Sequence, residues 1–558
     1  MPVESAPHRL QLVPRAALAG LAAWLAGGRF QMVSDDAWIS WRYSWNLVHG
    51  YGLRYNPHAE PVEGYSNLLW TLWSAVGIRL HIPVASWCFG SGLALAALTT
   101  WLTAAIAWRL SGSRMAERSA GLLAATSYAI GSCATTGLET PLLVALVTGS
   151  VYLCSLPSVG ALWAGALCAG FAATTHVQGP IFLLAPLVAA LLRGGISRRQ
   201  WAVLGVLALG PFAAQEVFRL AYYHSPLPLT FLVKMSGSRG TRLVNGIRLL
   251  GAAITLNLGW VALAALGTWV GRRKAAVPVA VIIADVAFIL IVNGDDIGGL
   301  RFIASAMPAL AVLAGLGLAA ITRRGVPGWL VAGAAVLATG AWELTIQHVR
   351  VARVEESGSQ NAEDTLGAAL TPPWVLHESQ SVLAPFTGAW TTPAEPQQAE
   401  WFITWLVENV PLDGSFTFAD VGLVGYTFNG TDLWDMRGLN WPATARMNAV
   451  SLAQHGGSQS SPEAGALVED FAARSPDVAL FLCQGGRPIG RSEDVLGASP
   501  VFVGRYRFVG SGTYFPASRE SICVYQRLDA SVPTEVAVKM RRDQIARDMP
   551  GIYAGTGP

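Results

Sequence analysis

Long apolar stretches fill the first 346 residues of this chain, and they constrain its fold more than any other feature. A transmembrane helix needs about 20 mostly apolar residues, because backbone polar groups in lipid must be satisfied within the segment. Only 13% of the residues are charged and the mean hydropathy is +0.42, whereas soluble domains carry about 25% charged residues. The candidate spans are 13–33, 88–108, 119–134, 138–155, 159–175, 178–192, 201–222, 247–270, 276–293, 302–321 and 327–346. The sequence therefore predicts a multispan α-helical membrane protein with about 11 helices.

Four basic clusters set the expected orientation of these spans, because basic loops stay in the cytoplasm. They are Arg109, Arg114 and Arg118; Arg193, Arg198 and Arg199; Arg272, Arg273 and Lys274; and Arg323 with Arg324. The loops near 35–86, 135–138, 223–246 and 294–301 then lie outside. If residues 65–82 spanned the bilayer, either the pair Asp35–Asp36 or the Arg109 cluster would lie on the wrong side of the membrane. We therefore expect these residues to form a helix at the outer interface, with Trp70 and Trp73 at headgroup depth.

The composition changes near residue 347, after which apolar runs alternate with polar segments. We expect residues 1–346 to form the transmembrane domain, with a first outer loop at 34–87, and residues 347–558 to form an extracytoplasmic α/β domain. Ser461 before Pro462 is typical of a helix start. Cys483 and Cys523 can pair if this domain faces an oxidising compartment, although two cysteines give no spacing pattern. Strands are expected at Phe416–Val421, Val478–Leu482, Val501–Phe508 and Ile522–Gln526.

Two adjacent carboxylates, Asp35 and Asp36, follow the first apolar stretch. A solvated, helix-capping acidic pair is one interpretation of this pattern. The other is a general base, because the hydroxyl of a sugar acceptor must lose its proton as it attacks an anomeric carbon. Neighbouring carboxylates also suit a divalent cation, so the pair is a candidate metal site as well.

Glu139 and His176 stand at the outer ends of two expected spans. A charge between apolar helices is costly, so Glu139 is a candidate functional acid, with capping of the following helix as the alternative. His176 is either a hydrogen-bonded packing residue or a ligand for a phosphate or sugar. Asp285, in the middle of a span, is expected to have a polar partner on another helix rather than a chemical role.

Two cations in later outer loops are candidates for binding a phosphate. Lys234 follows an apolar run and reaches back toward the bilayer, either to a lipid phosphate or simply as a snorkelling side chain. Arg301 begins a span and suits bidentate phosphate binding, with a structural ion pair to Asp295 or Asp296 as the alternative. The chain has no G-x-x-x-x-G-K-[ST] pattern, so an outer-face transferase would need a lipid-carried sugar donor.

Several motifs together resemble the GT-C glycosyltransferases, and among these the terminal β-(1→2) arabinofuranosyltransferase family of bacterial cell-wall assembly. The most specific block is the first outer loop, from Asp35-Asp36-Ala37-Trp38-Ile39 through Val62-Glu63-Gly64-Tyr65-Ser66-Asn67. Further matching blocks are Gly137-Leu138-Glu139-Thr140, Tyr222-Tyr223 with Pro226-Leu227-Pro228 and Lys234, Arg301-Phe302, and Asp420-Val421-Gly422 through Asp435-Met436-Arg437-Gly438-Leu439-Asn440.

The resemblance implies an inverting membrane enzyme that transfers a sugar, such as arabinofuranose, from a polyprenyl phosphate to an extracytoplasmic glycan or glycoconjugate. It implies a bacterial inner-membrane location and a role in cell-envelope biogenesis. No cofactor is required, and a divalent cation is the alternative. By position, Asp35 or Asp36 becomes the base, with Asp35 favoured, and Lys234 and Arg301 become candidates for binding the donor phosphate. His176 stands where the chain departs from the family motif, and its own position at an outer span end makes it a candidate to assist them. Candidate sugar or acceptor ligands are Arg42, Tyr43, Glu63, Asn67, Glu139 and Tyr223.

Two other classes of protein remain open at this point. A transporter or flippase for lipid-linked glycans would carry polar pairs along a path through the membrane, whereas here the polar groups gather on one face. A non-catalytic assembly protein would bind the polyprenyl lipid without needing the acidic pair. The net charge of +3 gives no case for nucleic acid. In the soluble part, Trp434, Trp441 and Tyr426 either stack on sugar rings or pack in the core.

Overall fold

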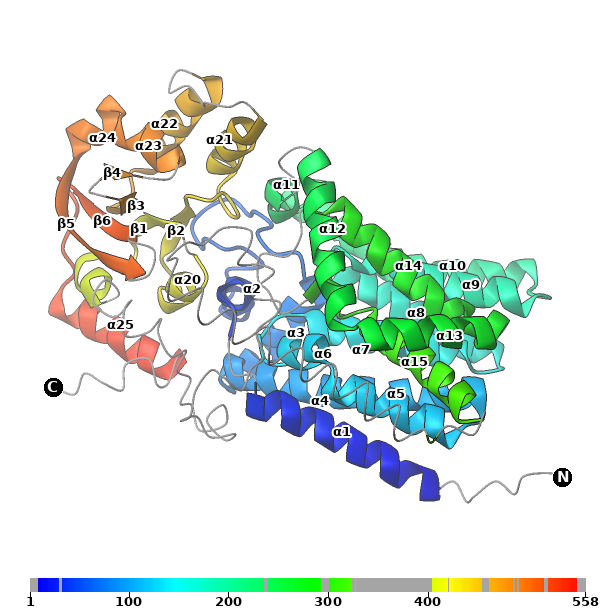
Figure 1. Cartoon of the computed structure of the whole chain (residues 1–558). Coiled ribbons are helices and arrows are strands. Elements are labelled where there is room, and N and C mark those ends of the chain that lie inside the picture. Colours follow the sequence, from blue (N-terminus) through cyan, green and yellow to red (C-terminus); the bar gives the residue numbers. More distant parts are fainter. Residues whose placement is uncertain are drawn as a thin grey trace.

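The computed structural model describes residues 9–29, 33–234, 239–292, 301–323, 327, 404–419, 421–453, 461–484, 487–488, 491–515 and 520–548. A helical region, α1 to α15, carries an α/β domain at one end (Figure 1). The helical elements are α1 Arg9–Arg29, α2 Asp35–Val48, α3 Leu68–Arg79, α4 Val84–Ser111, α5 Arg114–Thr126, α6 Tyr128–Cys133, α7 Thr140–Cys154, α8 Val159–Thr175, η1 Gly179–Leu183, α9 Leu184–Arg193, α10 Arg198–Tyr223, α11 Leu229–Lys234, α12 Arg239–Leu256, α13 Leu258–Gly271, η2 Arg272–Ala275, α14 Ala276–Ile291, η3 Arg301–Ile303 and α15 Met307–Thr322.

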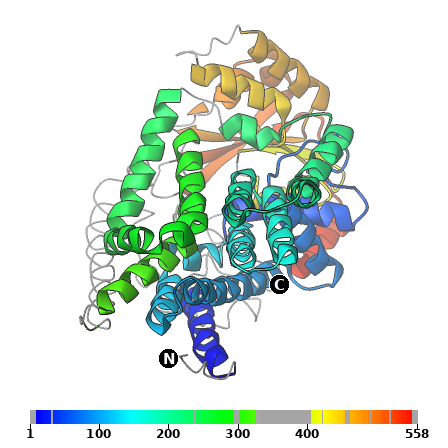
Figure 2. The same ribbon diagram turned by 90° about the vertical axis from the view of Figure 1, so that its right-hand side faces the viewer.

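Three described helical stretches are long and apolar enough to cross a membrane: Val84–Ser111, Arg198–Tyr223 and Leu258–Ile291. Five further described helices are apolar but shorter, with 10–17 residues each. Figure 2 views the molecule from its helical end, with the strands of the α/β domain visible behind the helices. The expected span at 327–346 lies outside the described residues, apart from residue 327, so the count of about 11 helices stays a prediction.

Several expected spans are interrupted in the structure, and in two of them a single polar residue separates the two helices. The stretch 119–134 divides into α5 and α6 at Ser127, whose extended backbone and hydroxyl cap the second helix through the N–H of Ile130. The stretch 247–270 divides at Asn257, whose side-chain amide donates to the carbonyl of Ala253 at 2.9 Å. Polar side chains that form hydrogen bonds with nearby backbone groups compete with the continuation of a helix. A count of apolar residues does not reveal this competition.

The segment 65–82 forms the 12-residue helix α3, too short to span a bilayer. Trp73 is 40% exposed, as expected for a side chain at an interface. The prediction for Trp70 was wrong: its ring is buried, and its Nε1 donates to the carbonyl of Gly137 at 2.8 Å. Helix α3 is therefore held against the protein on the Trp70 side and open on the Trp73 side.

The α/β domain is built on a six-stranded sheet of order β2-β1-β3-β6-β5, with β4 paired to β3. Its pairs β1–β2 and β1–β3 are parallel, and β3–β6 and β5–β6 are antiparallel. In Figure 1 the helices α22 to α24 lie above the sheet and α25 lies below it. The elements are β1 Ser415–Phe418, α20 Leu423–Thr427, β2 Asp432–Asp435, α21 Pro442–Ala453, α22 Pro462–Arg474, β3 Val478–Gln484, β4 Arg487–Pro488, α23 Arg491–Gly497, α24 Pro500–Arg505, β5 Tyr506–Phe515, β6 Glu520–Arg527 and α25 Glu535–Asp548.

Local sequence signals decided which expectations for this domain hold. Ser461 caps α22 by accepting the N–H of Ala464 at 3.2 Å, as predicted. The strand expected at Val501–Phe508 is wrong in its first half, because Ser499 caps the short helix α24 and Pro500 occupies its first turn. Cys483 and Cys523 form a disulfide between β3 and β6.

The first outer loop and the α/β domain share one hydrophobic core. Side chains from the loop pack with the inner side chains of β1, β2, β3 and β6. The loop residues in this core are Ile39, Tyr43, Leu53, Tyr55 and Tyr65. Trp434, Trp441 and Tyr426 are buried as well, which supports core packing for these three aromatic side chains. The domain is thus packed onto the loop that carries the acidic pair.

Candidate active site

Helix α2 begins at the acidic pair, with Asp35 and Asp36 in its first turn. Negative charge is favourable there because the first N–H groups of a helix point out of its end. The N–H of Ser34 donates to the carbonyl of Thr136 at 2.9 Å, so the loop before Glu139 lies beside the start of α2. Asp35 is exposed and Asp36 is half-buried, so the pair stays open to solvent.

The two aspartates lie on different stripes of α2, because successive helical residues are rotated by about 100°. Asp35 shares a stripe with Arg42, seven residues later, and this stripe faces the α/β domain. Asp36 shares a stripe with Ser40, four residues later, whose hydroxyl donates to the Oδ1 of Asn67 at 3.1 Å. Asp36 is therefore on the side of α2 that faces the rest of the candidate site.

Asp35 is bound by the α/β domain through both carboxylate oxygens. Its Oδ2 accepts the N–H of Gly422 at 3.1 Å, and its Oδ1 accepts the N–H of Leu423 at 2.8 Å. These bonds join residues 387 and 388 positions apart in the sequence. Asp35 was the residue preferred as the base from the sequence, and both of its carboxylate oxygens accept hydrogen bonds from the backbone.

A chain of buried polar groups runs from Asn67 into the helical region. The Nδ2 of Asn67 donates to the Oε2 of Glu139 at 2.7 Å. The Oε1 of Glu139 lies 3.7 Å from the Nε2 of His176, and both side chains are buried. The Nδ1 of His176 accepts the N–H of Gln178 at 3.2 Å, which leaves Nε2 as the protonated nitrogen of a neutral ring facing Glu139.

The buried chain ends beside Arg301. The His176 ring lies 5.8 Å from the ring of Phe302, and the guanidinium carbon of Arg301 lies 4.9 Å from that same ring. The His176 ring and the Arg301 guanidinium therefore both lie beside Phe302, and their predicted phosphate-binding role stays a prediction. Gln178 donates to Asp285 and, at 3.0 Å, to the carbonyl of Phe302, which confirms the expected polar partner of Asp285.

Lys234 is the last residue of α11, and its side chain is not among the described ones. The N–H of Leu229, the first residue of α11, donates to the carbonyl of Glu63 at 3.0 Å. Helix α11 also lies beside α21 of the α/β domain (Figure 1). The loop that carries Lys234 is thereby attached to the first outer loop. Asp295 and Asp296 lie outside the described residues, so their pairing with Arg301 stays untested.

Glu63 forms a buried ion pair with Arg219, at 2.6 Å between Oε2 and Nε and 3.2 Å between Oε1 and Nη2. Burial raises the pKa of the Glu63 carboxyl, and the guanidinium of Arg219 opposes that rise. The hydroxyl of Tyr223 donates to the carbonyl of Leu53 at 2.5 Å. These contacts connect the outer end of α10 to the first loop. The sugar-binding role of Glu63 and Tyr223 stays a prediction.

Arg42 is fully buried, and its guanidinium donates to four backbone carbonyls: those of Tyr55, Gly425, Phe428 and Thr431. Burial lowers the pKa of Arg42, while the guanidinium also stacks 4.3 Å from the centre of the Tyr55 ring. Through these hydrogen bonds Arg42 attaches α2 to the α/β domain. Its predicted sugar contact stays untested.

Tyr43 is likewise occupied within the first loop. Its hydroxyl donates to the carbonyl of Val62 at 2.7 Å and accepts the N–H of Gly64 at 2.8 Å. Burial raises the pKa of the Tyr43 hydroxyl, which keeps it a neutral donor. A side chain at Gly64 would collide with this hydroxyl and with the carbonyl of Leu439, so the glycine permits the close approach of the loop.

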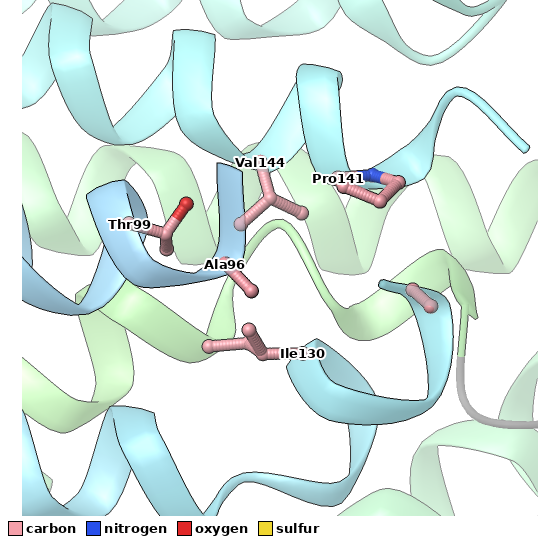
Figure 3. A pocket seen from close by; sticks show the side chains of 6 residues that line it. Ala96, Thr99, Ile130, Pro141 and Val144 are labelled. Carbon is pink, nitrogen blue, oxygen red and sulfur yellow. The ribbon is translucent and has the colours of Figure 1, made fainter. Parts of the chain in front are cut away.

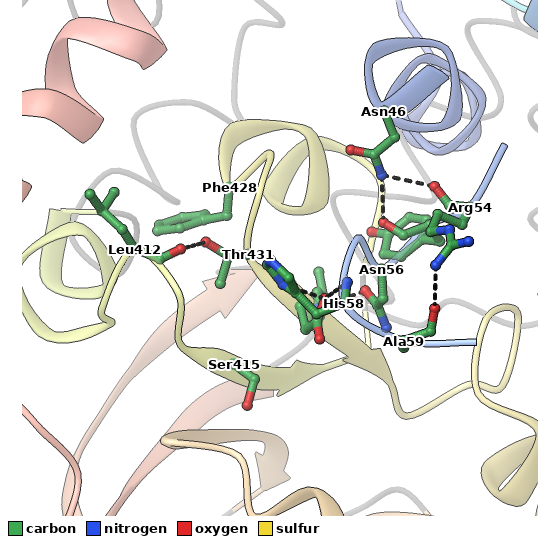
Figure 4. Close-up of polar contacts among 12 residues, drawn as sticks. Asn46, Arg54, Asn56, His58, Ala59, Leu412, Ser415, Phe428 and Thr431 are labelled. Carbon is green, nitrogen blue, oxygen red and sulfur yellow. Dashed lines mark hydrogen bonds and ion pairs between the residues drawn. The ribbon is translucent and has the colours of Figure 1, made fainter. Parts of the chain in front are cut away.

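The loop around Asn56 joins the edge of strand β2 (Figure 4). The Oδ1 of Asn56 accepts the N–H of Leu433 at 2.9 Å, and the N–H of His58 donates to Asp432 at 3.2 Å. Asn46 holds the loop from the α2 side by donating to the carbonyls of Arg54 and Tyr55 at 2.8 and 2.9 Å. Sequence reasoning missed Asn56 and Gly422, because no local signal pairs residues almost 400 positions apart.

A small cavity opens between α4, α6 and α7 (Figure 3). It is lined by Ala96, Thr99, Ile130, Cys133, Pro141 and Val144. It has room for about one water molecule, far too little for a sugar. Within the described ranges, no group of three or more His, Cys, Asp or Glu side chains is arranged to hold a metal ion.

No family model and no curated protein matches this sequence. Solved structures do match. ArnT from Cupriavidus metallidurans bound to undecaprenyl phosphate is 12% identical, with a TM-score of 0.53, over 93% of this chain and 98% of that chain. Its apo state is 14% identical, with a TM-score of 0.54 and the same coverage. The archaeal oligosaccharyltransferase AglB from Archaeoglobus fulgidus, in complex with an inhibitory peptide and a dolichol-phosphate, is 11% identical, with a TM-score of 0.50, over 90% and 80% of the two chains.

These neighbours are ArnT and an archaeal oligosaccharyltransferase, each solved with or without a polyprenyl-type lipid phosphate. At such identities the similarity shows the fold alone: this chain has the fold of ArnT and AglB. The helical region with an α/β domain at one end matches both ArnT and AglB across almost the whole chain.

Proposed function

We propose that this chain is a membrane glycosyltransferase that takes a sugar from a polyprenyl phosphate and passes it to an extracytoplasmic glycan or glycoconjugate. The observation that carries the proposal is the arrangement at α2. Helix α2 begins at an open acidic pair, and Ser40 on the same helix starts a chain of buried polar groups through Asn67 and Glu139 to His176, whose ring lies beside Phe302, next to Arg301. The structures of ArnT bound to undecaprenyl phosphate and of AglB with a dolichol-phosphate support a lipid-phosphate carrier for this fold.

The basic end of the site suits the phosphate of the donor. Arg301 is buried against Phe302, where a guanidinium interacts with an anion more strongly than it does in water. His176 can donate a hydrogen bond from Nε2, the nitrogen that faces Glu139. Lys234 is the third candidate, on the loop attached to Glu63. As the bond between the anomeric carbon and the phosphate oxygen breaks, these residues would stabilise the departing phosphate.

Asp36 is the better candidate for the base. Both oxygens of Asp35 already accept backbone N–H groups, whereas Asp36 lies on the stripe of α2 that faces Asn67. In the proposed step, the acceptor oxygen forms a bond to the anomeric carbon and its proton passes to Asp36. The polyprenyl phosphate leaves with the electron pair of the broken bond. Attack opposite the leaving group inverts the anomeric configuration.

We propose the outer face of the bacterial inner membrane as the location, and arabinofuranose as the first sugar to test. The resemblance of the first outer loop to terminal arabinofuranosyltransferases supports both. The α/β domain would position the acceptor, since it packs directly against the loop that carries Asp35 and Asp36. A cell-wall or envelope glycan is the acceptor class that fits this location.

The test is sugar transfer by the purified full-length protein in lipid nanodiscs. Synthetic polyprenyl-phosphate sugars, arabinofuranose beside several hexoses and pentoses, are offered with envelope glycan fractions, and the products are identified by mass spectrometry. We expect transfer from at least one donor and none from nucleotide sugars. If no polyprenyl-phosphate sugar is consumed while the lipid moves between leaflets, the protein is a transporter and the proposal fails. Binding of the lipid without either activity would indicate an assembly protein instead.

A further inference from the structure

We propose that Asp35 is a positioning residue, through which the α/β domain fixes the start of α2 and so the direction of Asp36. The inference rests on the proposed function for its kinetic consequence. Its structural part, the bonding of Asp35 to Gly422 and Leu423, can be tested without any sugar donor. The α/β domain then completes the catalytic unit in addition to binding the acceptor.

Three contacts along α2 define this attachment. At the first turn, the carboxylate of Asp35 accepts the N–H groups of Gly422 and Leu423. One turn later, the ring of Trp38 lies 5.2 Å from that of Tyr426. Two turns later, Arg42 donates to the carbonyls of Gly425, Phe428 and Thr431. The same short stretch of the domain therefore contacts α2 at each turn.

Asp35 is the contact closest to the proposed base, because it is the residue next to Asp36. The first N–H groups of a helix have no partner within it, so the first turn frays unless something holds it. Bonds to two backbone N–H groups of a separate domain hold the Asp35 side chain and, with it, the first turn. A misplacement of a catalytic group by about 1 Å can lower the reaction rate about 100-fold. Loss of the contacts that hold this turn should therefore lower kcat.

Gly422 is required for this contact. A Cβ at this position would overlap both the backbone carbonyl and the carboxylate of Asp35. Replacement of Gly422 by alanine therefore pushes the domain away from α2, although both aspartates are still present in the chain. Gly465, in α22 of the same domain, has open space where its Cβ would be, so Gly465→Ala is a matched control.

The experiment compares Asp35→Ala, Asp35→Asn, Gly422→Ala and Gly465→Ala with the wild type in nanodiscs. The first measurement is the kcat and KM of sugar transfer. We expect kcat to fall about 10- to 100-fold in Asp35→Ala and Gly422→Ala, with the KM for the donor nearly unchanged. Asp35→Asn should recover part of the loss, because an amide oxygen still accepts one of the two N–H groups. Gly465→Ala should behave as the wild type.

The second measurement is hydrogen exchange of the backbone N–H of Leu423, in protein without any donor. We expect faster exchange in Asp35→Ala and Gly422→Ala than in the wild type and in Gly465→Ala. Full kcat in Gly422→Ala, or unchanged exchange in Asp35→Ala, would overturn the inference. If the wild type transfers no sugar, the proposed function fails by itself, and the exchange result alone then decides whether Asp35 holds the domain.

Discussion

Two kinds of buried acid stand in contrast in this protein. Glu117 and Glu63 are each matched by arginine: Glu117 by Arg15 at 2.5 Å and Arg114 at 3.3 Å, and Glu63 by Arg219 at 2.6 Å. Glu139, also buried, accepts a hydrogen bond from the amide of Asn67 and lies 3.7 Å from the ring nitrogen of His176. A guanidinium neutralises the charge of the first two acids, so we expect their main effect to be on stability, whereas we expect Glu139, which has no guanidinium partner within the described part of the chain, to matter for the reaction.

The comparison extends to α2. The carboxylate of Asp35 is held by backbone N–H groups, and both aspartates remain open to solvent. Polar groups that could serve a reaction therefore gather at one end of the helical region, around α2, Glu139 and Arg301. The arginine-matched pairs hold the surrounding helices in place. The following variants test this division.

The largest effect is expected for Asp36→Asn, which removes the proposed base and keeps the shape of the side chain. General-base catalysis contributes about 100- to 10,000-fold, so kcat for sugar transfer should fall by that factor. Binding of undecaprenyl phosphate, measured by tryptophan fluorescence or calorimetry, should stay unchanged. Asp543→Asn, at an exposed position of α25, is the control. Wild-type turnover in Asp36→Asn would remove the base from the mechanism.

Glu117→Ala should act on the fold instead of the reaction. It leaves Arg15 buried beside Arg114 without its carboxylate partner, and breaking such a pair costs about 3–5 kcal/mol of stability. Thermal unfolding in detergent should show a clearly lower Tm. The kcat of the folded fraction should match the wild type, and a selective loss of kcat at unchanged Tm would contradict the division between the two kinds of acid.

Arg301→Gln should weaken the binding of the lipid phosphate. A hydrogen bond to a charged group contributes about 1.5–3 kcal/mol, so the Kd for undecaprenyl phosphate should rise about 10- to 100-fold. Titration of the purified variant with this lipid provides the measurement. Arg323→Gln, at the opposite end of α15, is the control for loss of positive charge. Equal affinities in Arg301→Gln and the wild type would place the phosphate elsewhere.

The smallest effect is expected for Glu216→Gln. Glu216 also contacts Arg219, but it is partly exposed and its pairing is therefore screened by solvent. We expect a change below about 1 kcal/mol in stability and no change in transfer. A large loss of stability would show that Glu216, rather than Glu63, is the main partner of Arg219.

Features that depend on neighbouring residues were mostly predictable from the sequence, whereas the contacts of the first outer loop with the α/β domain were not. The limits of α10 and the capped start of α22 at Ser461 follow from local patterns of apolar, basic and capping residues. The half-wrong strand at Val501–Phe508 was local too, since the capping signal of Ser499 and Pro500 outweighed the apolar run.

For the site, residue type indicated the candidates but did not assign their roles. His176 and Arg301 were predicted as phosphate ligands, and both lie beside the ring of Phe302, while that role stays a prediction. The identical chemistry of Asp35 and Asp36 could not show which one the α/β domain holds. That assignment depends on Gly422, which becomes a neighbour of α2 only after both regions have folded.

The most direct test of the central claim follows the donor itself through one turnover. A polyprenyl-phosphate sugar labelled at the anomeric carbon is incubated with the wild type and acceptor, and NMR records the anomeric configuration and the polyprenyl phosphate released. We expect one polyprenyl phosphate for each sugar transferred, with the configuration inverted. Retained configuration, or transfer without release of polyprenyl phosphate, would contradict direct attack by an acceptor that a carboxylate at α2 deprotonates.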